Sequence, residues 1–394
     1  MSPRRPVLRR DGSWELVPDP TDDPRFDRYG FCRDPSQLAA VVAWEAQYAA
    51  RLAQQELRWR RAPAEARRGG PHVRRLARRG IPATRRQLVW PRALAAAQFR
   101  AEWPEAHFAS LLAAPPSAWQ AEVERQIGLD LARTFPGHQL LAQPGGQEQL
   151  RQVLTAFSRH LPEIGYVQGL GMLAALLLVV VGAAEGAFWC LVGLVQAKLP
   201  AAFYDRSLSG CRVELAVLQE LIEERLPLLA AHLRTHAVRV ELFATRWFVG
   251  LFASTLPPET ALRVWDLLVF EGARTLHGVA LALLGTMEHT LLHCEEQSSL
   301  LCALQDCQGQ CYDCERLMLL CGSRRYAVAD ATLVALRRHI ARSGVVADGP
   351  FSTATLSACA ELPCAGCEWE EESSEWDELE YELVSRDDAL EVHG

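Results

Sequence analysis

The sequence predicts an all-α fold, and three observations support this prediction. Apolar residues recur at helical spacing along most of the chain, and turns such as Leu161-Pro162-Glu163 separate the periodic stretches. Strand signals are scarce, since the β-branched piece Val238–Val240 has no partners with turns at regular spacing. With 394 residues, 49% of them hydrophobic, the chain can bury a large core.

The N-terminal part begins without periodicity and then becomes helical. The first 26 residues mix Pro, Arg and Asp, so we expect them to be disordered. Order is expected from Asp27–Phe31, followed by a long amphipathic helix from Pro35 to about Arg61. A short helix then opens at Arg79-Gly80-Ile81-Pro82 and reaches Trp90, because Pro82 suits a first helical turn.

Twelve further helical patterns follow. They cover Glu105–Leu112, Trp119–Arg133, Gly146–His160, Leu170–Val181, Gly186–Lys198, Val213–Arg225, Leu242–Thr255, Pro258–Phe270, Thr275–Cys294, Ser298–Gln305, Gln310–Cys321 and Ala329–Arg342. The most apolar of them, Leu170–Val181, is shorter than the roughly twenty residues that a bilayer requires. We therefore predict a buried core helix there and no transmembrane segment.

The ends of the chain differ in charge. The net charge of -7 combines an arginine-rich first hundred residues with an acidic run from Glu368 to Glu391, which we predict to be disordered or a short interaction segment. The basic residues are dispersed through helical patterns without an RNA or DNA motif, so we expect no nucleic-acid partner. Residues 1–10 lack the apolar core of a signal peptide, and we expect a cytoplasmic protein.

These patterns divide the chain into five segments. They are a disordered N-terminus (1–26), a helical extension (27–74), a central domain (75–320), a C-terminal helix (321–344) and an acidic tail (345–394).

Arg133 is the first candidate functional residue. Ile127, Asp130 and Arg133 are spaced three apart, so they fall on one side of a helix with Asp130 within reach of the guanidinium. Pro136 cannot continue the helix, which places Arg133 in the last turn with its side chain projecting beyond the end. This position suits a cation that enters another protein's active site, although most arginines at a helix C-terminus are simply solvated.

Gln168 is the second candidate, within Gly165-Tyr166-Val167-Gln168-Gly169. The two glycines allow unusual backbone angles and close approach, so Gln168 is expected at a tight exposed corner at the start of the most apolar helix. Its amide both donates and accepts hydrogen bonds, as needed to hold a water against a phosphate. The alternative is that Gln168 only caps the helix.

Several motifs of the chain, in this order, resemble those of the TBC domain family of Rab GTPase-activating proteins. They are Arg79-Gly80-Ile81-Pro82 with Arg86 and Trp90, Ile127-x-x-Asp130-x-x-Arg133-Thr134-Phe135-Pro136, Tyr166-x-Gln168-Gly169, Phe188-Trp189, Arg246-Trp247-Phe248, Leu256-Pro257, Arg263-Val264-Trp265-Asp266 and Glu271-Gly272. Within the family, the segments Asp27–Phe31 and Glu241–Gly272 look most similar to the subgroup of the growth-hormone-regulated TBC protein and carabin.

The resemblance implies an irregular multi-helix TBC-type domain over residues 75–320, with flexible extensions, that acts on a Rab-type GTPase in its GTP form during vesicle trafficking. It implies that Arg133 is an arginine finger and that Gln168 is a glutamine supplied in trans. Asp130 would hold Arg133, while Tyr166 and Gly169 would support the Gln168 loop. GTP and Mg²⁺ would be carried by the partner, so no cofactor or metal of this chain's own is expected.

One departure keeps other functions open. Where the family usually has Met-Asn after the glutamine motif, this chain has Leu170-Gly171, which puts no polar side chain beneath the loop.

The main alternative is a catalytically weak TBC-type scaffold or effector that binds a small GTPase. Another is a helical adaptor that recruits a tail-binding protein. The presence of Arg133 and Gln168 favours the activator.

The remaining motifs are interpreted as structural. The tryptophan-rich segment Arg246–Asp266 has helical spacing and is predicted to be core, with Arg263 and Asp266 paired on it. Cys311-x-x-Cys314 and Cys364-x-x-Cys367 have the spacing of zinc ligands. However, the first pair lies in a helical pattern and the second in a segment of little predicted order. We therefore expect mostly free thiols and no zinc site.

Overall fold

The computed structural model describes residues 4–8, 14–18, 25–62 and 71–343. Within them the chain is helical apart from an N-terminal hairpin, in which β1 (Arg4–Leu8) pairs antiparallel with β2 (Trp14–Pro18). The all-α prediction is confirmed for the domain, and the rest of the predicted disordered segment, 1–26, lies outside the described residues up to residue 24. Val7, Trp14 and Val17 are residue types that fit a pleated ladder, although the run is too short to show a period.

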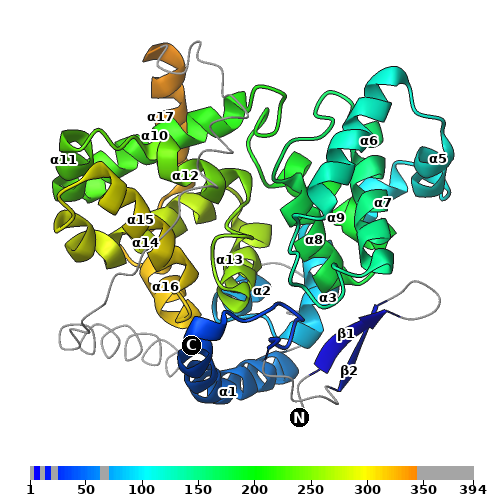
Figure 1. Cartoon of the computed structure of the whole chain (residues 1–394), viewed down its shortest axis with the longest axis horizontal. Coiled ribbons are helices and arrows are strands. Elements are labelled where there is room, and N and C mark those ends of the chain that lie inside the picture. Colours follow the sequence, from blue (N-terminus) through cyan, green and yellow to red (C-terminus); the bar gives the residue numbers. More distant parts are fainter. Residues whose placement is uncertain (1–3, 9–13, 19–24, 63–70, 344–394) are drawn as a thin grey trace. The chain divides into compact units, whose positions relative to one another are not determined.

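Figure 1 shows how the helices are arranged. Their bounds are η1 Pro35–Gln37, α1 Leu38–Arg61, α2 Pro71–Arg78, α3 Ala83–Ala93, α4 Ala96–Ala101, α5 His107–Ala113, α6 Ala118–Leu131, α7 Pro144–His160, α8 Leu170–Val181, α9 Ala184–Ala197, α10 Ser209–Arg225, α11 Pro227–Thr235, α12 Val240–Val249, α13 Pro258–Glu271, α14 Arg274–Leu292, α15 Gln297–Gly309, α16 Cys314–Gly322 and α17 Asp330–Ser343.

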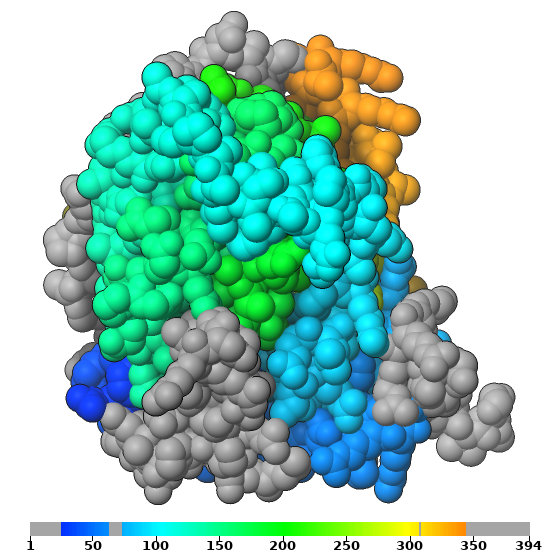
Figure 2. Space-filling view, turned by 90° about the vertical axis from the view of Figure 1, so that its right-hand side faces the viewer, coloured from blue at the N-terminus to red at the C-terminus, as the bar shows by residue number. Residues whose placement is uncertain are grey.

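The core forms around α8, whose side chains are apolar all round. Leu173, Leu176 and Leu177 are almost fully buried, and α8 packs against α3, α6, α7 and α9. Figure 2 views the side of the domain that lies to the right in Figure 1, where the surface is formed mainly by the first half of the chain. Because α8 is buried and spans Leu170–Val181, the predicted core helix is confirmed with the same bounds. Among the described helices, none combines the length and apolar character needed to cross a bilayer.

A second group of helices is built on α14, which contacts α10, α11, α12, α13, α15 and α16. Contacts between α3 and α13 connect this second group to the helices around α8 (Figure 1). The last described helix, α17, packs on α10, where Arg337 donates to the buried Glu214 at 2.6 and 2.8 Å. The predicted tail, 345–394, lies outside the described residues.

Several helix ends differ from the sequence-based expectation. The pattern Leu242–Thr255 stops at Val249, because Leu251 and Phe252 adopt positive φ angles of 46° and 61° and turn the chain. The pattern Gln310–Cys321 begins only at Cys314, where the Asp313 side chain accepts from the backbone N–H of Arg316. The short helices α2, α4 and α11, of eight, six and nine residues, were not predicted.

Candidate functional site

Helix α6 carries the first predicted site residue at its C-terminal end. It begins with a capping box, in which Ser117 and Gln120 each satisfy a backbone N–H of the other. It ends at Leu131, so the prediction that Arg133 lies in the last helical turn is wrong by two residues. The helix stops there because Phe135, which precedes Pro136, is at φ 48° and is not helical.

Arg133 is consequently on a turn just beyond α6. Its backbone N–H donates to the carbonyl of Asp130 at 3.1 Å, and its side chain is 69% exposed. The guanidinium makes only weak contacts, with Nε 3.4 Å from the Leu129 carbonyl oxygen and Nη2 3.8 Å from Oδ1 of Asp130. An exposed pair of this kind contributes about 0–1 kcal/mol, so Arg133 can leave it at little cost.

Asp130 connects the arginine to the loop that carries Gln168. The hydroxyl of Tyr166 donates to Oδ2 of Asp130 at 2.8 Å, while Oδ1 faces Arg133. Burial raises the pKa of Tyr166, and the Asp130 carboxylate acts in the same direction, so the hydroxyl stays protonated and remains a donor. The Asp130 carboxylate thus contacts both the turn that carries Arg133 and the loop that carries Gln168.

The loop between α7 and α8 places Gln168 at an exposed corner, as predicted. Gly165 and Gly169 have φ angles of 65° and 115°, which L-residues rarely adopt. A Cβ at Gly169 would lie 2.6 Å from Cγ1 of Val249, so this position also lacks space for a side chain. The close approach of α12 therefore explains why a glycine must follow Gln168.

Gly171, where the sequence departs from the family pattern, lies beneath this arrangement. A Cβ built there would be 3.1 Å from Oγ1 of Thr134 and 3.3 Å from the hydroxyl oxygen of Tyr166. The Thr134 hydroxyl is itself bonded to the Asp130 carbonyl at 2.8 Å. A side chain at position 171 would therefore point toward the Asp130–Tyr166 contact, and in this chain the contact forms without one.

The turn after Arg133 is held by the N-terminal segment Tyr29–Cys32, a contact that the sequence did not reveal. The rings of Phe31 and Phe135 meet edge to face at 5.0 Å, and the Gln139 backbone N–H donates to the Gly30 carbonyl at 2.7 Å. His138 bridges the two segments, because its Nε2 lies 3.1 Å from the Tyr29 carbonyl oxygen. Residues 25–34 thus belong to the support of the site.

His138 must be neutral to make its hydrogen bonds. Its Nδ1 accepts from the backbone N–H groups of Leu140 and Leu141, both at 3.1 Å, and its Nε2–H is left to donate to Tyr29. Burial lowers the pKa of His138 to about 4, which keeps the ring in this neutral form at physiological pH.

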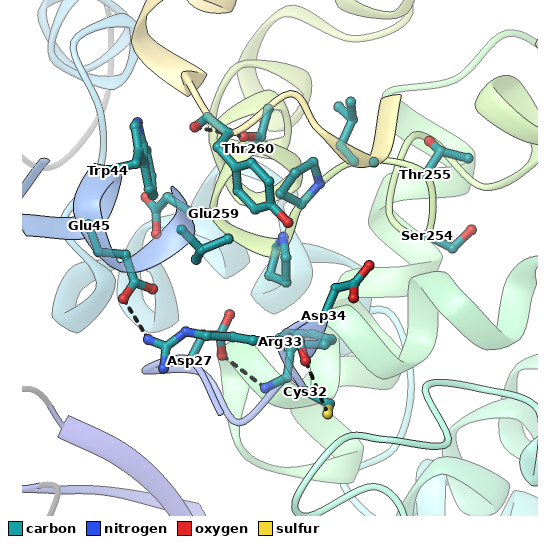
Figure 3. Close-up of a pocket in the computed structure, with 17 residues that line it drawn as sticks. Asp27, Cys32, Arg33, Asp34, Trp44, Glu45, Ser254, Thr255, Glu259 and Thr260 are labelled. Carbon is teal, nitrogen blue, oxygen red and sulfur yellow. Dashed lines mark hydrogen bonds and ion pairs between the residues drawn. The ribbon is translucent and has the colours of Figure 1, made fainter. Parts of the chain in front are cut away.

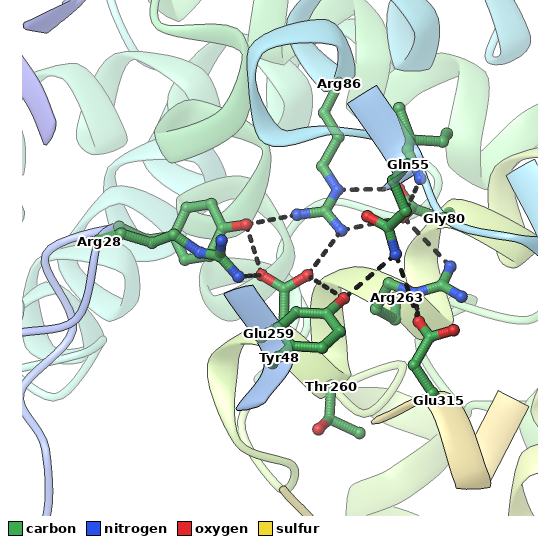
Figure 4. Close-up of polar contacts among 12 residues, drawn as sticks. Arg28, Tyr48, Gln55, Gly80, Arg86, Glu259, Thr260, Arg263 and Glu315 are labelled. Carbon is green, nitrogen blue, oxygen red and sulfur yellow. Dashed lines mark hydrogen bonds and ion pairs between the residues drawn. The ribbon is translucent and has the colours of Figure 1, made fainter. Parts of the chain in front are cut away.

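A buried charge network joins the motifs that flank the site (Figure 4). Asp266 accepts two hydrogen bonds from Arg86, at 3.0 and 2.9 Å, and one each from Trp90 Nε1 at 3.0 Å and the Ile81 backbone N–H at 3.1 Å. Arg263 lies 3.6 Å from Asp266, so the predicted pair forms, although the bonds to Arg86 are shorter. These motifs are 180 residues apart and hold α3 against α13.

Glu259 is the member of the network that sequence reasoning missed. It accepts from Arg28 at 2.7 Å, Tyr29 at 2.5 Å, Tyr48 at 3.2 Å and Arg86 at 3.2 Å. Although burial opposes ionisation, the cations Arg28 and Arg86 bring the pKa of Glu259 down to about 2. No local sequence pattern predicts the role of Glu259, because three of its four partners come from the N-terminal extension.

A pocket of about 230 Å³ lies where residues 27–34 meet α1 and the start of α13 (Figure 3). Its charged groups already have partners within the protein. Arg33 donates to Glu45 at 2.6 Å, and Asp27 accepts from the backbone N–H groups of Tyr29 and Phe31 at 2.9 Å each. The pocket contains none of the predicted site residues, and its walls serve to attach the N-terminal segment.

Of the two cysteine pairs with zinc-like spacing, the structure describes only Cys311 and Cys314. Cys311 and Cys314 are free thiols, and burial raises the pKa of Cys311 to about 12. No cluster of three or more His, Cys, Asp or Glu residues able to hold a metal occurs among the described residues. Cys364 and Cys367 lie outside them.

Comparisons with known proteins agree with the family resemblance of the motifs. The family model of the Rab-GTPase-TBC domain matches residues 84–292. TBC1 domain family member 2A of Mus musculus is 37% identical over 284 residues, which are 69% of this chain and 31% of that protein. The chain therefore spans about a third of the length of that relative.

Growth hormone-regulated TBC protein 1 of Xenopus tropicalis is 32% identical over 276 residues, covering 68% of this chain and 79% of that protein. Among solved structures, the Chlamydomonas flagellar RabGAP TBC domain aligns with a TM-score of 0.64 at 28% identity, over 76% of this chain and all of that one. The Ypt/Rab-GAP domain of Gyp1p has the same fold, with a TM-score of 0.58 at 17% identity, over 73% of this chain and 99% of that one.

Proposed function

Because this chain belongs to the Rab-GTPase-TBC domain family, we propose that it is a GTPase-activating protein for a Rab-type GTPase. The observation that carries this proposal is the Asp130 carboxylate, which lies 3.8 Å from Arg133 and accepts from Tyr166 at 2.8 Å. This carboxylate contacts both the exposed Arg133 and the loop that carries the exposed Gln168. A protein that only binds its partner would need neither group in this relation.

Arg133 would supply positive charge to the partner's phosphates. Hydrolysis of GTP spreads negative charge over the phosphate oxygens, and a fixed cation from an activating protein increases the rate about 10³- to 10⁵-fold. Arginine suits this task because its planar guanidinium can reach two oxygens and stays charged. The exposed side chain and its weak internal contacts leave Arg133 able to reach a docked partner.

Gln168 would orient the attacking water from outside the partner. Its amide can accept from the water and donate to a phosphate oxygen. The two glycines allow the positive φ angles of the loop, and the bond from Tyr166 to Asp130 holds the loop against α6, which supports a defined position for the amide. GTP and its Mg²⁺ would be carried by the partner.

A panel of purified Rabs, each assayed for GTP hydrolysis with and without this chain, tests the proposal. We expect strong stimulation of at least one Rab, and loss of most of it with Arg133→Ala. Arg133→Lys should rescue little, because an ammonium group lacks the planar fork. Arg92→Ala serves as a matched control, since Arg92 is exposed and lies on α3 outside the site. Full stimulation by a folded Arg133→Ala protein would refute the role of Arg133, whereas binding of a GTP-loaded Rab without any stimulation would support the scaffold alternative.

A further inference from the structure

Trp119, in the first turn of α6, packs directly on the loop that carries Gln168. A Cβ built at Gly165 would lie 2.8 Å from Cζ2 and 2.9 Å from Cη2 of the indole ring. The ring therefore occupies the space that a side chain at position 165 would take. Trp119 remains 37% exposed, so it is not an ordinary core residue.

Arg206 contacts both the ring and the loop. Its guanidinium carbon lies 5.1 Å from the centre of the Trp119 ring, and its Nη2 is 3.5 Å from the Pro162 carbonyl oxygen. The turn that carries Arg206 is itself fixed, because Asp205 accepts from the backbone N–H groups of Ser207 at 3.0 Å and Ser209 at 2.8 Å.

We infer that Trp119 and Arg206 are positioning residues that hold loop 161–169 so that Gln168 is presented to the GTPase. This inference rests on the proposed function. The loop is attached to α6 at two points, with Gly165 against Trp119 near the start of the helix and Tyr166 bonded to Asp130 near its end. Because Arg133 directly follows the same helix, α6 sets the relative position of both fingers.

A support at the start of the loop matters here because Gly171 carries no side chain beneath it. A polar side chain at this position would add a contact beneath the loop, close to Thr134 and Tyr166. This chain lacks that side chain, and the Trp119–Arg206 contact supports the other end of the loop, around Pro162 and Gly165. The loop is therefore held from the side of α6 and the 205–209 turn.

The first test measures the loop without any GTPase. Hydrogen exchange of the full-length protein should show faster exchange in residues 161–169 for Trp119→Ala and, to a smaller degree, for Arg206→Ala, with α7 and α8 unchanged. Trp119→Phe should restore only part of the protection, because it keeps an aromatic face for Arg206 but lacks the indole atoms that contact Gly165. Trp103→Ala is the matched control, since Trp103 is also exposed and contacts His107 and His160. Unchanged exchange in the loop would overturn the inference.

The second test is a double-mutant cycle on catalysis. The assay uses a Rab that the chain stimulates. Trp119→Ala should lower the rate of GTP hydrolysis at a saturating concentration of the activating protein about tenfold, because a small displacement of an orienting group is costly. The concentration of activating protein that gives half-maximal stimulation should change little. In a Gln168→Ala background the same substitution should have no further effect, and an equal fall in both backgrounds would contradict a role through Gln168.

The two tests separate this inference from the proposed function. If Gln168→Ala itself leaves stimulation intact, the proposed role of the glutamine fails. The exchange measurement then still decides whether Trp119 and Arg206 hold the loop.

Discussion

His138 should make the stability of the domain depend on pH in a way that one substitution removes. The ring is buried and neutral, and its pKa falls from the ordinary 6.5 to about 4. Between these values the unfolded chain takes up a proton that the folded chain does not. The contribution of the neutral His138 ring to the free energy of unfolding is therefore complete above pH 6.5 and is lost as the pH falls toward 4.

The size of the effect follows from the two pKa values. Each pKa unit corresponds to about 1.4 kcal/mol, so the full difference amounts to roughly 3 kcal/mol, of which about 2 kcal/mol should be lost between pH 7 and pH 4.5. Urea unfolding followed by tryptophan fluorescence would measure it in the wild type and in His138→Asn. The free energies of unfolding of the two proteins should converge as the pH falls, since the variant lacks this group while all others are shared.

An exposed histidine provides the control. His339→Asn, an exposed substitution on α17, is the matched control variant for His138→Asn. An NMR titration of the His138 ring is the direct check, with an expected midpoint near 4. Parallel stability curves for wild type and His138→Asn, or a ring midpoint near 6.5, would refute the reasoning.

Three further predictions follow from the site and its support. Gly169→Ala should reduce stimulation at least about tenfold while the protein stays folded by circular dichroism, because the φ of 115° and Val249 leave no room for a Cβ; Gly309→Ala, with open space around it, should be neutral. Asp266→Asn should lower the free energy of unfolding by about 3–5 kcal/mol, since the buried Arg86 loses its nearer carboxylate and keeps only Glu259 at 3.2 Å, whereas the exposed control Asp330→Asn should change it by less than about 1 kcal/mol. A chain ending at residue 350 should keep full stimulation of GTP hydrolysis, because the segment beyond carries no site residue; loss of folded protein would contradict this.

The sequence predicted the helical architecture and its most buried element because both depend on local periodicity. Leu170–Val181 has the expected bounds, since an apolar run between Gly169 and Gly182 contains its own start and stop signals. The end of α12 was not predictable in this way. It depends on positive φ angles at Leu251 and Phe252, residue types that ordinarily continue a helix.

The local setting of the candidate residues could be predicted from the sequence, but their long-range contacts could not. Spacing placed Asp130 near Arg133, and the glycines marked the Gln168 corner. The bond from Tyr166 to Asp130 joins residues 36 apart, and the support from Tyr29 and Phe31 comes from more than a hundred residues away. Glu259 was missed for the same reason, because its role is set by partners in other elements.

The central claim is that this chain supplies both an arginine and a glutamine to a Rab. It is tested most directly by single-turnover GTP hydrolysis on a Rab whose own switch glutamine is replaced by alanine. If Gln168 orients the water from outside, the wild-type chain stimulates this Rab, and Gln168→Ala removes the stimulation while binding to the GTP-loaded Rab weakens far less. If the glutamine-deficient Rab does not respond and the Gln168→Ala protein still activates the unmodified Rab, the two-finger account is wrong and Arg133 acts alone.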